Sequence, residues 1–437
     1  MAKYLPIATF LLGLLASVLI AYGVDPYWGG FRHGLALILL TRRLQLPLMG
    51  LTLICIGLTL GMVAGARWKA AWLIGLMPIG ALLIHHFVSD PIQAFHVDDE
   101  PNFVAADQAT FIHDGDEVVG LTFDDQAFAY PYNVLFENPV VVHADPPHKL
   151  VLLWSAYANR AVALTADWTV KPRELEIVSM PANALLVINS RVGQFINGIT
   201  GLTPDGKKAA GFESQISTQK MSWKSWRHLH PATLVLQPPP DWRGNGPTGP
   251  ISPRFKMPAT DGPSLPPGTM VAMIQTSQPI AIDESAVADK PLNVAAAANP
   301  LLLFRDDTGQ MRVFLRQVNG DLTPRFFPAD EIGDAHPAEA ILTELDSKSW
   351  WTDDGRAIAG SLKGEKLQPL DVDEGVYLDV LQYWYPGLKL IRPTVQDIGR
   401  GPRSDIKPAP KRTTRHKTRS SRPRRLATLP KPSDIIG

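Results

Sequence analysis

The sequence predicts an N-terminal three-helix transmembrane segment followed by a mainly β (β-rich α+β) soluble region. Two uncharged apolar runs, Leu46–Ala66 and Ala70–Val88, flank the basic turn Arg67-Trp68-Lys69. At about 1.5 Å of rise per helical residue, each run reaches roughly the 30 Å of a bilayer's hydrocarbon core. From Val118 onward, short β-type segments alternate with turn residues, which is typical of a sandwich or a barrel.

A third apolar run, Tyr4–Val24, completes the predicted transmembrane region. A cleaved signal peptide is the alternative, because Ala21-Tyr22-Gly23 offers small residues to a peptidase, but the run is long for that purpose. Between the first two spans, Gly34–Leu40 is apolar, too short to cross a bilayer and flanked by arginines, so we expect an interfacial helix. The region covers residues 1–89, with spans at about 4–24, 46–66 and 70–88.

Three glycines recur every four residues in the second span, at Gly57, Gly61 and Gly65. This spacing allows a close helix approach, which we expect to involve span one or three of the same chain, with a homodimer face as the alternative. Basic residues do not decide the orientation, since three flank the spans on each side. They are Lys3, Arg67 and Lys69 on one side and Arg32, Arg42 and Arg43 on the other.

The net charge is zero, with 42 basic and 42 acidic residues, but the charges are unevenly distributed. The segment Gly399–Arg425 contains 11 Lys/Arg and one acid, Asp405, so the rest of the chain is net acidic. Its mixture of Lys/Arg with Pro, Ser and Thr predicts a basic disordered tail, residues 399–437, able to associate with polyanions. Cys55 is the only cysteine, which excludes a disulfide within the chain.

The first β-rich module is predicted over residues 101–237. Val118–Phe123 and Ala127–Tyr130 flank Asp124-Asp125-Gln126, which indicates a hairpin. A short helix, Trp223–Leu229, has Ser222 as its expected N-cap. The other expected strands are Val140–His143, Leu150–Trp154, Arg160–Leu164, Ala184–Ile188 and Thr233–Leu236.

A Pro-rich linker, residues 238–267, separates this module from a second one at residues 268–393. The linker holds ten prolines, which break helices and strand ladders. In the second module, Leu301–Arg305 and Met311–Leu315 flank a turn. Arg316–Val318 and Leu322–Phe326 flank Asn319-Gly320, a hairpin signal because both turn residues tolerate positive φ. A helix at Glu374–Trp384 and a strand at Leu388–Ile391 complete the module.

The two modules end alike. The segment from Trp223 to Leu236 can be laid over the end of the second module, so that Trp226 falls on Leu381, His230 on Tyr385 and Pro231 on Pro386. Each segment is a short helix that ends before a proline and is followed by a strand. The likeness indicates a duplicated module, with convergence on a common helix–turn–strand element as the alternative.

Three segments resemble the bacterial domain of unknown function 3179 family: Val118–Pro131 its opening signature, Trp223–Leu236 its closing signature, and Trp350–Leu370 the same family again. The resemblance runs from about Pro101 to Ile391, interrupted by the linker. Members are commonly secreted or membrane-anchored. The resemblance therefore implies a protein anchored in the inner membrane of a bacterium, with its soluble region outside the cytoplasm. No activity is implied.

The chain departs from this family at its chemically active positions. The resemblance implies a Cys-Pro-Leu-Cys motif on a central strand, where Ser155 and Ala158 stand here, and a Trp-His-Glu motif where Glu137-Asn138-Pro139 stands. Two thiolates and an imidazole suit a metal or redox centre, whereas a hydroxyl, a methyl and an amide do not. The implied chemistry is therefore lost.

Other patterns have simpler explanations. Gly201–Lys208 nearly matches a phosphate-binding loop, but Lys208 replaces the Mg²⁺-binding hydroxyl and Pro204 interrupts it, so we expect a turn. His143, Asp145 and His148 surround Pro146-Pro147 and read as a loop rather than a metal site. His228 and His230 read as surface or capping residues. The acid pairs sit beside turn residues and read as solvated turns: Asp124-Asp125, Asp306-Asp307 and Asp353-Asp354.

The sequence therefore predicts no catalytic, cofactor-binding or metal-binding residues and no cofactor. We expect a membrane-anchored envelope protein with a non-enzymatic binding or scaffolding role. Its partners are the lipid bilayer and, through the basic tail, anionic lipid or cell-wall polymer, rather than nucleic acid. Two alternatives are a divergent extracytoplasmic enzyme with an unrecognised site and a cytoplasm-facing polyanion-binding protein.

Overall fold

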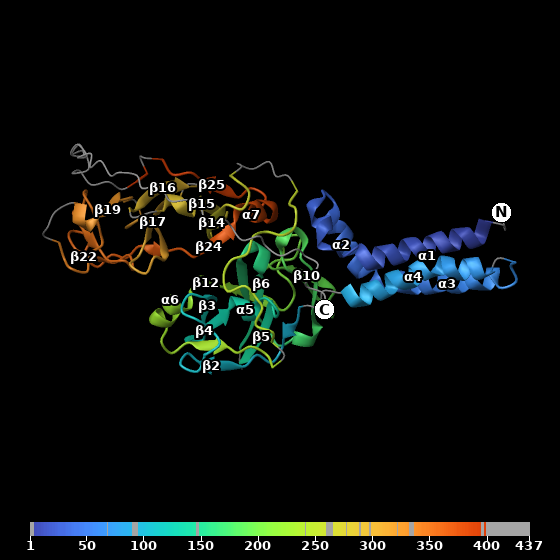
Figure 1. Ribbon diagram of the computed structural model, residues 1–437. Helices are drawn as coiled ribbons and strands as arrows, with labels where there is room; N and C mark the ends of the chain where they lie inside the picture. Colours follow the sequence, from blue (N-terminus) through green and yellow to red (C-terminus); the bar gives the residue numbers. More distant parts are fainter. Residues whose placement is uncertain are drawn as a thin grey trace, which may run out of the picture.

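The computed structural model shows a rod of helices at one end and stacked β-sheets at the other (Figure 1). The basic tail lies outside the described residues, as do parts of the predicted linker. The described residues are 4–67, 69–89, 95–145, 148–240, 242–258, 265–276, 278–287, 290–296, 299–320, 322–331, 336–394 and 397–398.

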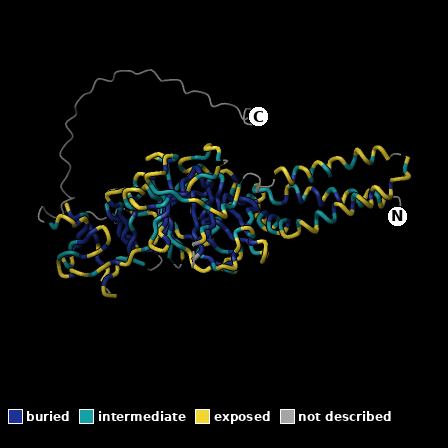
Figure 2. Tube along the Cα trace, turned by 90° about the horizontal axis from the view of Figure 1, so that it is seen from below, coloured by how far each residue is buried: buried dark blue, intermediate teal, exposed yellow. Residues whose placement is uncertain are grey.

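Three helices form the rod: α1 (Leu5–Tyr22), α3 (Gln45–Val63) and α4 (Lys69–Ser89). Each is long and apolar enough to cross a membrane, so the three-span prediction is confirmed at the level of helix length and composition. Many residues of the rod are exposed (Figure 2). Large apolar side chains are among them, including Leu53 at 61% and Ile74 at 67%. Such continuous apolar exposure suits lipid and not water.

The close contact between α1 and α3 uses a different glycine from those expected. A Cβ added to Gly13 would lie 2.9 Å from Cβ of Cys55, whereas one added to Gly57, Gly61 or Gly65 would meet nothing within 4 Å. The prediction that these three glycines admit a helix of the same chain is therefore wrong. Gly57 and Gly61 lie on the opposite face of α3 from its buried residues, because two positions along a helix turn the side chain by about 200°, and Gly65 follows the end of α3. The buried residues are Thr52, Cys55, Thr59 and Val63.

The connection between α1 and α3 is folded against the β-sheets. It contains the 3₁₀ helix η2 (Pro26–Gly30) and the helix α2 (Gly34–Arg43), which confirms a helix where an interfacial one was expected. Ile38 of α2 is fully buried in one cluster with Leu186 and Phe195. A Cβ on Gly29 would lie 2.4 Å from the backbone nitrogen of Ala182, so only glycine permits this approach.

The β-rich region consists of a first half, residues 95–258, and a second half, residues 265–398. The first half has three sheets, with strand orders β12-β3-β4-β13-β2, β1-β5-β6-β7-β11 and β10-β9-β8. Its elements are β1 (Val97–Asp98), β2 (Phe103–Ala105), β3 (Glu117–Phe123), β4 (Gln126–Pro131), α5 (Tyr132–Leu135), β5 (Val140–Asp145), β6 (His148–Ser155), β7 (Arg160–Ala166), β8 (Leu175–Ser179), η6 (Pro181–Asn183), β9 (Leu186–Asn189), β10 (Gln194–Asn197), β11 (Phe212–Ile216), β12 (Gln219–Ser222), α6 (Trp223–Leu229) and β13 (Leu234–Leu236).

The three sheets of the first half are stacked, and the middle sheet is buried on both faces. Val142 and Val151 pack toward β8–β10, while Val141 and Leu152 pack toward β3 and β4. This alternation follows from the two-residue period of a strand. Trp223 and Trp226 of α6 cover the free face of the β3–β4 sheet, giving four layers.

The second half repeats this arrangement. Its sheets have the orders β24-β14-β15-β25, β16-β17-β18-β23 and β19-β20-β21-β22, and the middle one again separates two apolar clusters. Its elements are β14 (Met270–Ile274), β15 (Ile280–Asp283), η7 (Glu284–Ala286), β16 (Leu292–Ala296), β17 (Asn299–Arg305), β18 (Met311–Leu315), β19 (Phe326–Pro328), η8 (Ala329–Glu331), β20 (Leu342–Glu344), β21 (Trp350–Trp351), β22 (Ala357–Ala359), β23 (Gln368–Pro369), β24 (Val372–Tyr377), α7 (Leu378–Trp384) and β25 (Lys389–Ile391).

The two halves share strand order and direction. In the β12-β3-β4-β13 set and in the β24-β14-β15-β25 set, the first two pairings are antiparallel and the last is parallel. A seven-residue helix, α6 or α7, follows the first strand of each set and leads to the last. The helices begin at Trp223 and Leu378, which places Trp226 on Leu381 as in the overlay.

Local predictions in the first half are confirmed. Asp124 and Asp125 both have positive φ in the tight β3–β4 turn, and Ser222 caps α6 by accepting a hydrogen bond from the Ser225 backbone N–H. The other expected strands are present, although β9 begins two residues later than predicted, at Leu186, and β13 one residue later, at Leu234.

Two predictions in the second half are wrong. The helix expected at Glu374–Trp384 begins at Leu378, because Gly375 has positive φ and the preceding residues pair with β14 as β24. The hairpin expected around Asn319-Gly320 is reduced to a single bridge between Val318 and Leu322, although both turn residues have the expected positive φ.

The described part of the predicted linker packs along the first half. Glu117 donates its backbone N–H to the carbonyl of Thr248, and the side-chain oxygen of Asn183 accepts from the backbone of Arg254 and Phe255. These contacts fix an extended chain against one half, so this part is not a free spacer.

We predict that Gly13→Ile destabilises the helical rod, while Gly61→Ile leaves it nearly unchanged. The added side chain at position 13 collides with Cys55, and such overpacking costs about 1–3 kcal/mol, whereas position 61 faces open space. Thermal unfolding of the detergent-purified full chain measures both. Equal midpoints for the two variants would contradict this packing.

Candidate functional site

A buried ion cluster joins the two halves. Asp373 of β24 pairs with Arg160, the first residue of β7, and its other carboxylate oxygen lies 2.8 Å from Nζ of Lys220 in β12. All three side chains are no more than 3% exposed. Buried charges of this kind need partners, because an unpaired ion inside a protein costs several kcal/mol. We call Arg160, Lys220 and Asp373 the interdomain ion cluster.

Backbone geometry places these groups. Asn159 has positive φ at the turn before β7, which orients its side chain toward the second half. Its Nδ2 donates to the carbonyl of Gly375 at 2.8 Å, and its Oδ1 accepts from the hydroxyl of Tyr132 at 2.8 Å. Nζ of Lys220 also donates to the Asn159 carbonyl, and Nε of Arg160 donates to the carbonyl of Ile199 at 2.6 Å. Backbone carbonyls of the first half therefore hold both cations of the cluster in place.

Two further carboxyl groups border the cluster. Burial raises the pKa of Glu117, an effect that the nearby Lys220 partly offsets. Burial also raises the pKa of Glu284, whose carboxylate accepts the backbone N–H of Gly375. Burial disfavours the charged form of both carboxyl groups. Their contribution therefore lowers the free energy of unfolding at neutral pH, and this effect is relieved as the pH falls and the groups become protonated.

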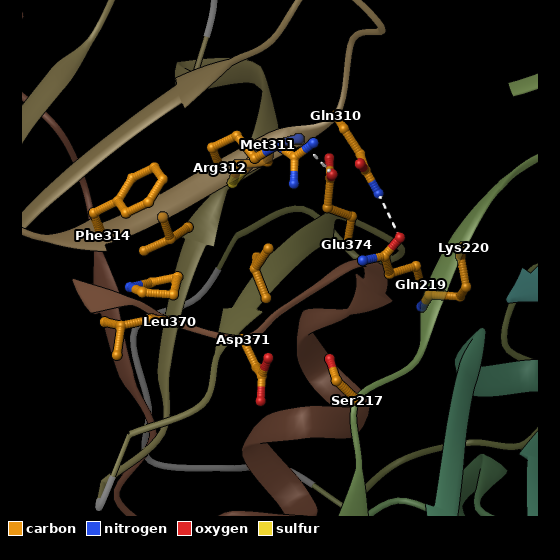
Figure 3. Close-up of a pocket in the computed structure, with 13 residues that line it drawn as sticks. Ser217, Gln219, Lys220, Gln310, Met311, Arg312, Phe314, Leu370, Asp371 and Glu374 are labelled. Carbon is orange, nitrogen blue, oxygen red and sulfur yellow. Dashed lines mark hydrogen bonds between the residues drawn. The ribbon is translucent and has the colours of Figure 1, made fainter. Parts of the chain in front are cut away.

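A solvent-accessible cavity of about 160 Å³ lies beside the cluster, between β12 of the first half and β18 and β24 of the second (Figure 3). Gln310 of the second half donates from Nε2 to Oε1 of Gln219 at 3.1 Å across it. Its charged wall residues are already paired: Lys220 with Asp373, Arg312 with Asp306, and Glu374 with Arg305. The exception is Asp371, which has no ion pair among the described residues.

The positions implied by the family resemblance are closed. Ser155 is 1% exposed; its hydroxyl accepts from the Leu185 backbone N–H at 2.9 Å and donates to the Gly198 carbonyl at 3.2 Å. Ala158 is fully buried in one apolar cluster with Val271 and Val376 of the second half. The second half of the chain therefore covers the surface around Ala158.

The remaining sequence candidates do not come together. Gly201–Lys208 forms a turn with no helix after it, as expected. The His143 ring packs against the Phe103 and Phe128 rings, with centroids 5.0 and 4.8 Å away, while the side chains of Asp145 and His148 lie outside the described residues. His230 caps α6 against the Trp226 ring. Within the described part of the chain, no group of three metal-ligating side chains occurs.

Sequence reasoning missed the interdomain ion cluster. Arg160 begins a predicted strand, whereas no predicted strand contains Lys220 or Asp373, and the structure puts them in β12 and β24. One signal was available: Asn159, a residue that tolerates positive φ, stands directly before the strand that begins with Arg160.

Three helices that could span a membrane and a β-rich region with a buried joint define a protein with a candidate membrane-spanning segment and a layered β-domain. The chain belongs to the family described as protein of unknown function (DUF3179), whose model matches residues 92–385 and thus runs through both halves. Searches of curated proteins and of solved structures returned no match.

We predict that Asp373→Asn destabilises the chain by about 3–5 kcal/mol, because Arg160 and Lys220 stay buried without a counter-charge. The matched control is Asp114→Asn, which breaks the exposed pair with Arg227 and should cost under about 1 kcal/mol. Denaturant unfolding of the detergent-purified full chain compares them. A cost for Asp373→Asn as small as that of the control would show that the cluster does not hold the halves.

Proposed function

We propose that this chain is an extracytoplasmic, membrane-anchored protein that binds or scaffolds at the bacterial cell envelope without catalysing a reaction. The observation that carries the proposal is the closure around Ser155 and Ala158. The hydroxyl of Ser155 is committed to two backbone groups, and Ala158 supports the packing of the second half. Where the family resemblance implies a reactive cysteine, Ala158 of this chain packs against the second half.

The two halves are, in this proposal, related modules produced by duplication. The shared strand order, the shared directions and the equivalent helices α6 and α7 support it. A second module fused to the first covers part of the surface that the first would otherwise expose. It also extends the protein away from the rod of helices and adds new surface of its own, which favours binding over catalysis.

The contacts of the arginines support the proposed orientation. The C-terminal end of α1, the helix α2 and the start of α3 lie at the β-rich end of the rod, and the N-terminal end of α1 lies at the far end (Figure 1). Arg42 pairs with Glu176, so its charge is neutralised in the folded protein. Setting it aside leaves Lys3, Arg67 and Lys69 against Arg32 and Arg43, which favours a cytoplasmic far end.

Two alternatives make different demands. An enzyme with an unrecognised site would use the cavity in Figure 3, but the wall cations Lys220 and Arg312 and the acid Glu374 are neutralised by partners, which favours a passive surface. A cytoplasm-facing polyanion binder would rely on the basic tail and requires the opposite orientation.

We predict that the detergent-purified full chain contains no stoichiometric transition metal, because the donors at positions 155 and 158 are a committed hydroxyl and a methyl group. Elemental mass spectrometry after dialysis against trace metal measures this. One tightly bound zinc, iron or copper ion per chain would refute the proposed loss of the centre.

We predict that alkaline phosphatase fused after Ser89 is active in a bacterial host and that the same enzyme fused after Arg67 is inactive. The phosphatase folds only outside the cytoplasm, and the two points lie at opposite ends of α4. A β-galactosidase fusion at each point provides the reciprocal control. Activity of the phosphatase after Arg67 alone would establish the cytoplasm-facing alternative.

A further inference from the structure

A second cavity, of about 450 Å³, lies where α2 meets the turn between β10 and β11. Its wall includes Leu39 and Arg43 of α2, Phe195 of β10, and Asp205, Lys207 and Lys208 of the turn. Neither the family match nor the proposed binding role assigns anything to it. Its position and its charge both indicate what it binds.

The position places the cavity at the surface of the bilayer. Arg43 is the last residue of α2, and α3, a candidate span, begins two residues later at Gln45. The side chain of Gln45 contacts His86 of α4 at 2.8 Å, so the helices α3 and α4 meet at the same level. The polar layer of a bilayer is about 5–8 Å thick on each side, and two helical residues advance only about 3 Å. Arg43 therefore lies among the lipid headgroups.

The charge of the cavity suits an anion. Arg43, Lys207 and Lys208 are cationic, and the single acid in the wall, Asp205, is bound by Lys207 at 2.8 Å and by the Thr203 hydroxyl at 2.6 Å. Two positive charges thus remain without a counter-ion in this wall. The adjacent arginines have separate tasks, since Arg42 pairs with Glu176 while Arg43 lies over the Phe195 ring, 5.4 Å from its centroid.

Apolar side chains continue from the cavity toward the rod. Leu39 is in the cavity wall, and the next leucines along the chain are exposed: Leu40 at 55%, Leu44 at 41% and Leu46 at 78%. A ligand with a charged head and an apolar tail matches both features, whereas a free anion uses only one. A guanidinium group and two ammonium groups are the usual partners of phosphate oxygens.

We propose that this cavity binds the phosphate headgroup of an anionic phospholipid, with Arg43, Lys207 and Lys208 contacting the headgroup and the acyl chains lying beside Leu40 and Leu44. The bound lipid fixes α2, and with it the first half, at the bilayer surface. The site needs only that α3 crosses the membrane, and it is independent of which side the β-rich region faces. Its failure would therefore leave the proposed orientation and role intact.

The test uses the full chain in dodecyl maltoside, titrated with dihexanoyl phosphatidylglycerol while the unfolding temperature is followed. The variant is Arg43→Gln/Lys208→Gln, which keeps Lys207 in place for Asp205. Each basic residue near an anionic lipid surface contributes about fivefold in affinity, so we expect the variant to need roughly 25-fold more lipid. The matched control, Lys171→Gln/Lys363→Gln, removes two exposed lysines outside the cavity and should behave as the unaltered chain.

Three outcomes would overturn the proposal. They are an unchanged lipid response in the variant, an equal response of the unaltered chain to dihexanoyl phosphatidylcholine, and an equal response to inorganic phosphate at the same concentration. The second would indicate lipid binding without charge selection, and the third a site for a free anion.

A second measurement avoids the variant in case it does not fold. Cys55→Ser/Lys208→Cys carries a single thiol, because Cys55 is the only native cysteine. A fluorophore there, in liposomes containing a lipid with a nitroxide headgroup, should be quenched at least about twofold more than one at Lys363→Cys. Equal quenching at the two positions would place the cavity away from the bilayer and would overturn the proposal.

Discussion

The structure depends on one ionic contact, in which a single carboxylate from the second half neutralises two cations from the first. The Coulomb attraction between buried ions is strong, but it only offsets the cost of removing them from water. What the contact gives is specificity: Arg160 and Lys220 can be buried only where Asp373 is present. The apolar packing around Ala158 adds area to this joint, while the ions set its geometry.

The first half could be read closely from the sequence, because its signals are local. The Asp124-Asp125 turn needs only two residues that tolerate positive φ, and α6 needs only a serine cap and two tryptophans on one face. The start of α7 could not be read in this way. Residues from Glu374 to Tyr377 carry no local sign of a strand partner, and their pairing with β14, about a hundred residues away in the chain, makes them a strand.

The functional surfaces were harder to predict for the same reason. Arg160 and Asp373 are 213 residues apart, and an isolated charge in a β-type segment carries no sign of a distant partner. The glycines of α3 show the opposite error: their regular spacing indicates a helix contact, yet Gly13, alone in α1, makes it. Spacing describes a face of a helix, and it does not say what lies opposite that face.

The folded connection between α1 and α3 has a mechanical consequence. Since η2 and α2 are packed against the β8–β10 sheet, with Gly29 against Ala182, the β-rich region is braced on the rod at two places in the sequence instead of swinging from one tether. Both connections to the rod are short or folded, so the β-rich region keeps a set angle to the rod. With α1, α3 and α4 as membrane spans, this bracing would also hold the region at a set height above the bilayer.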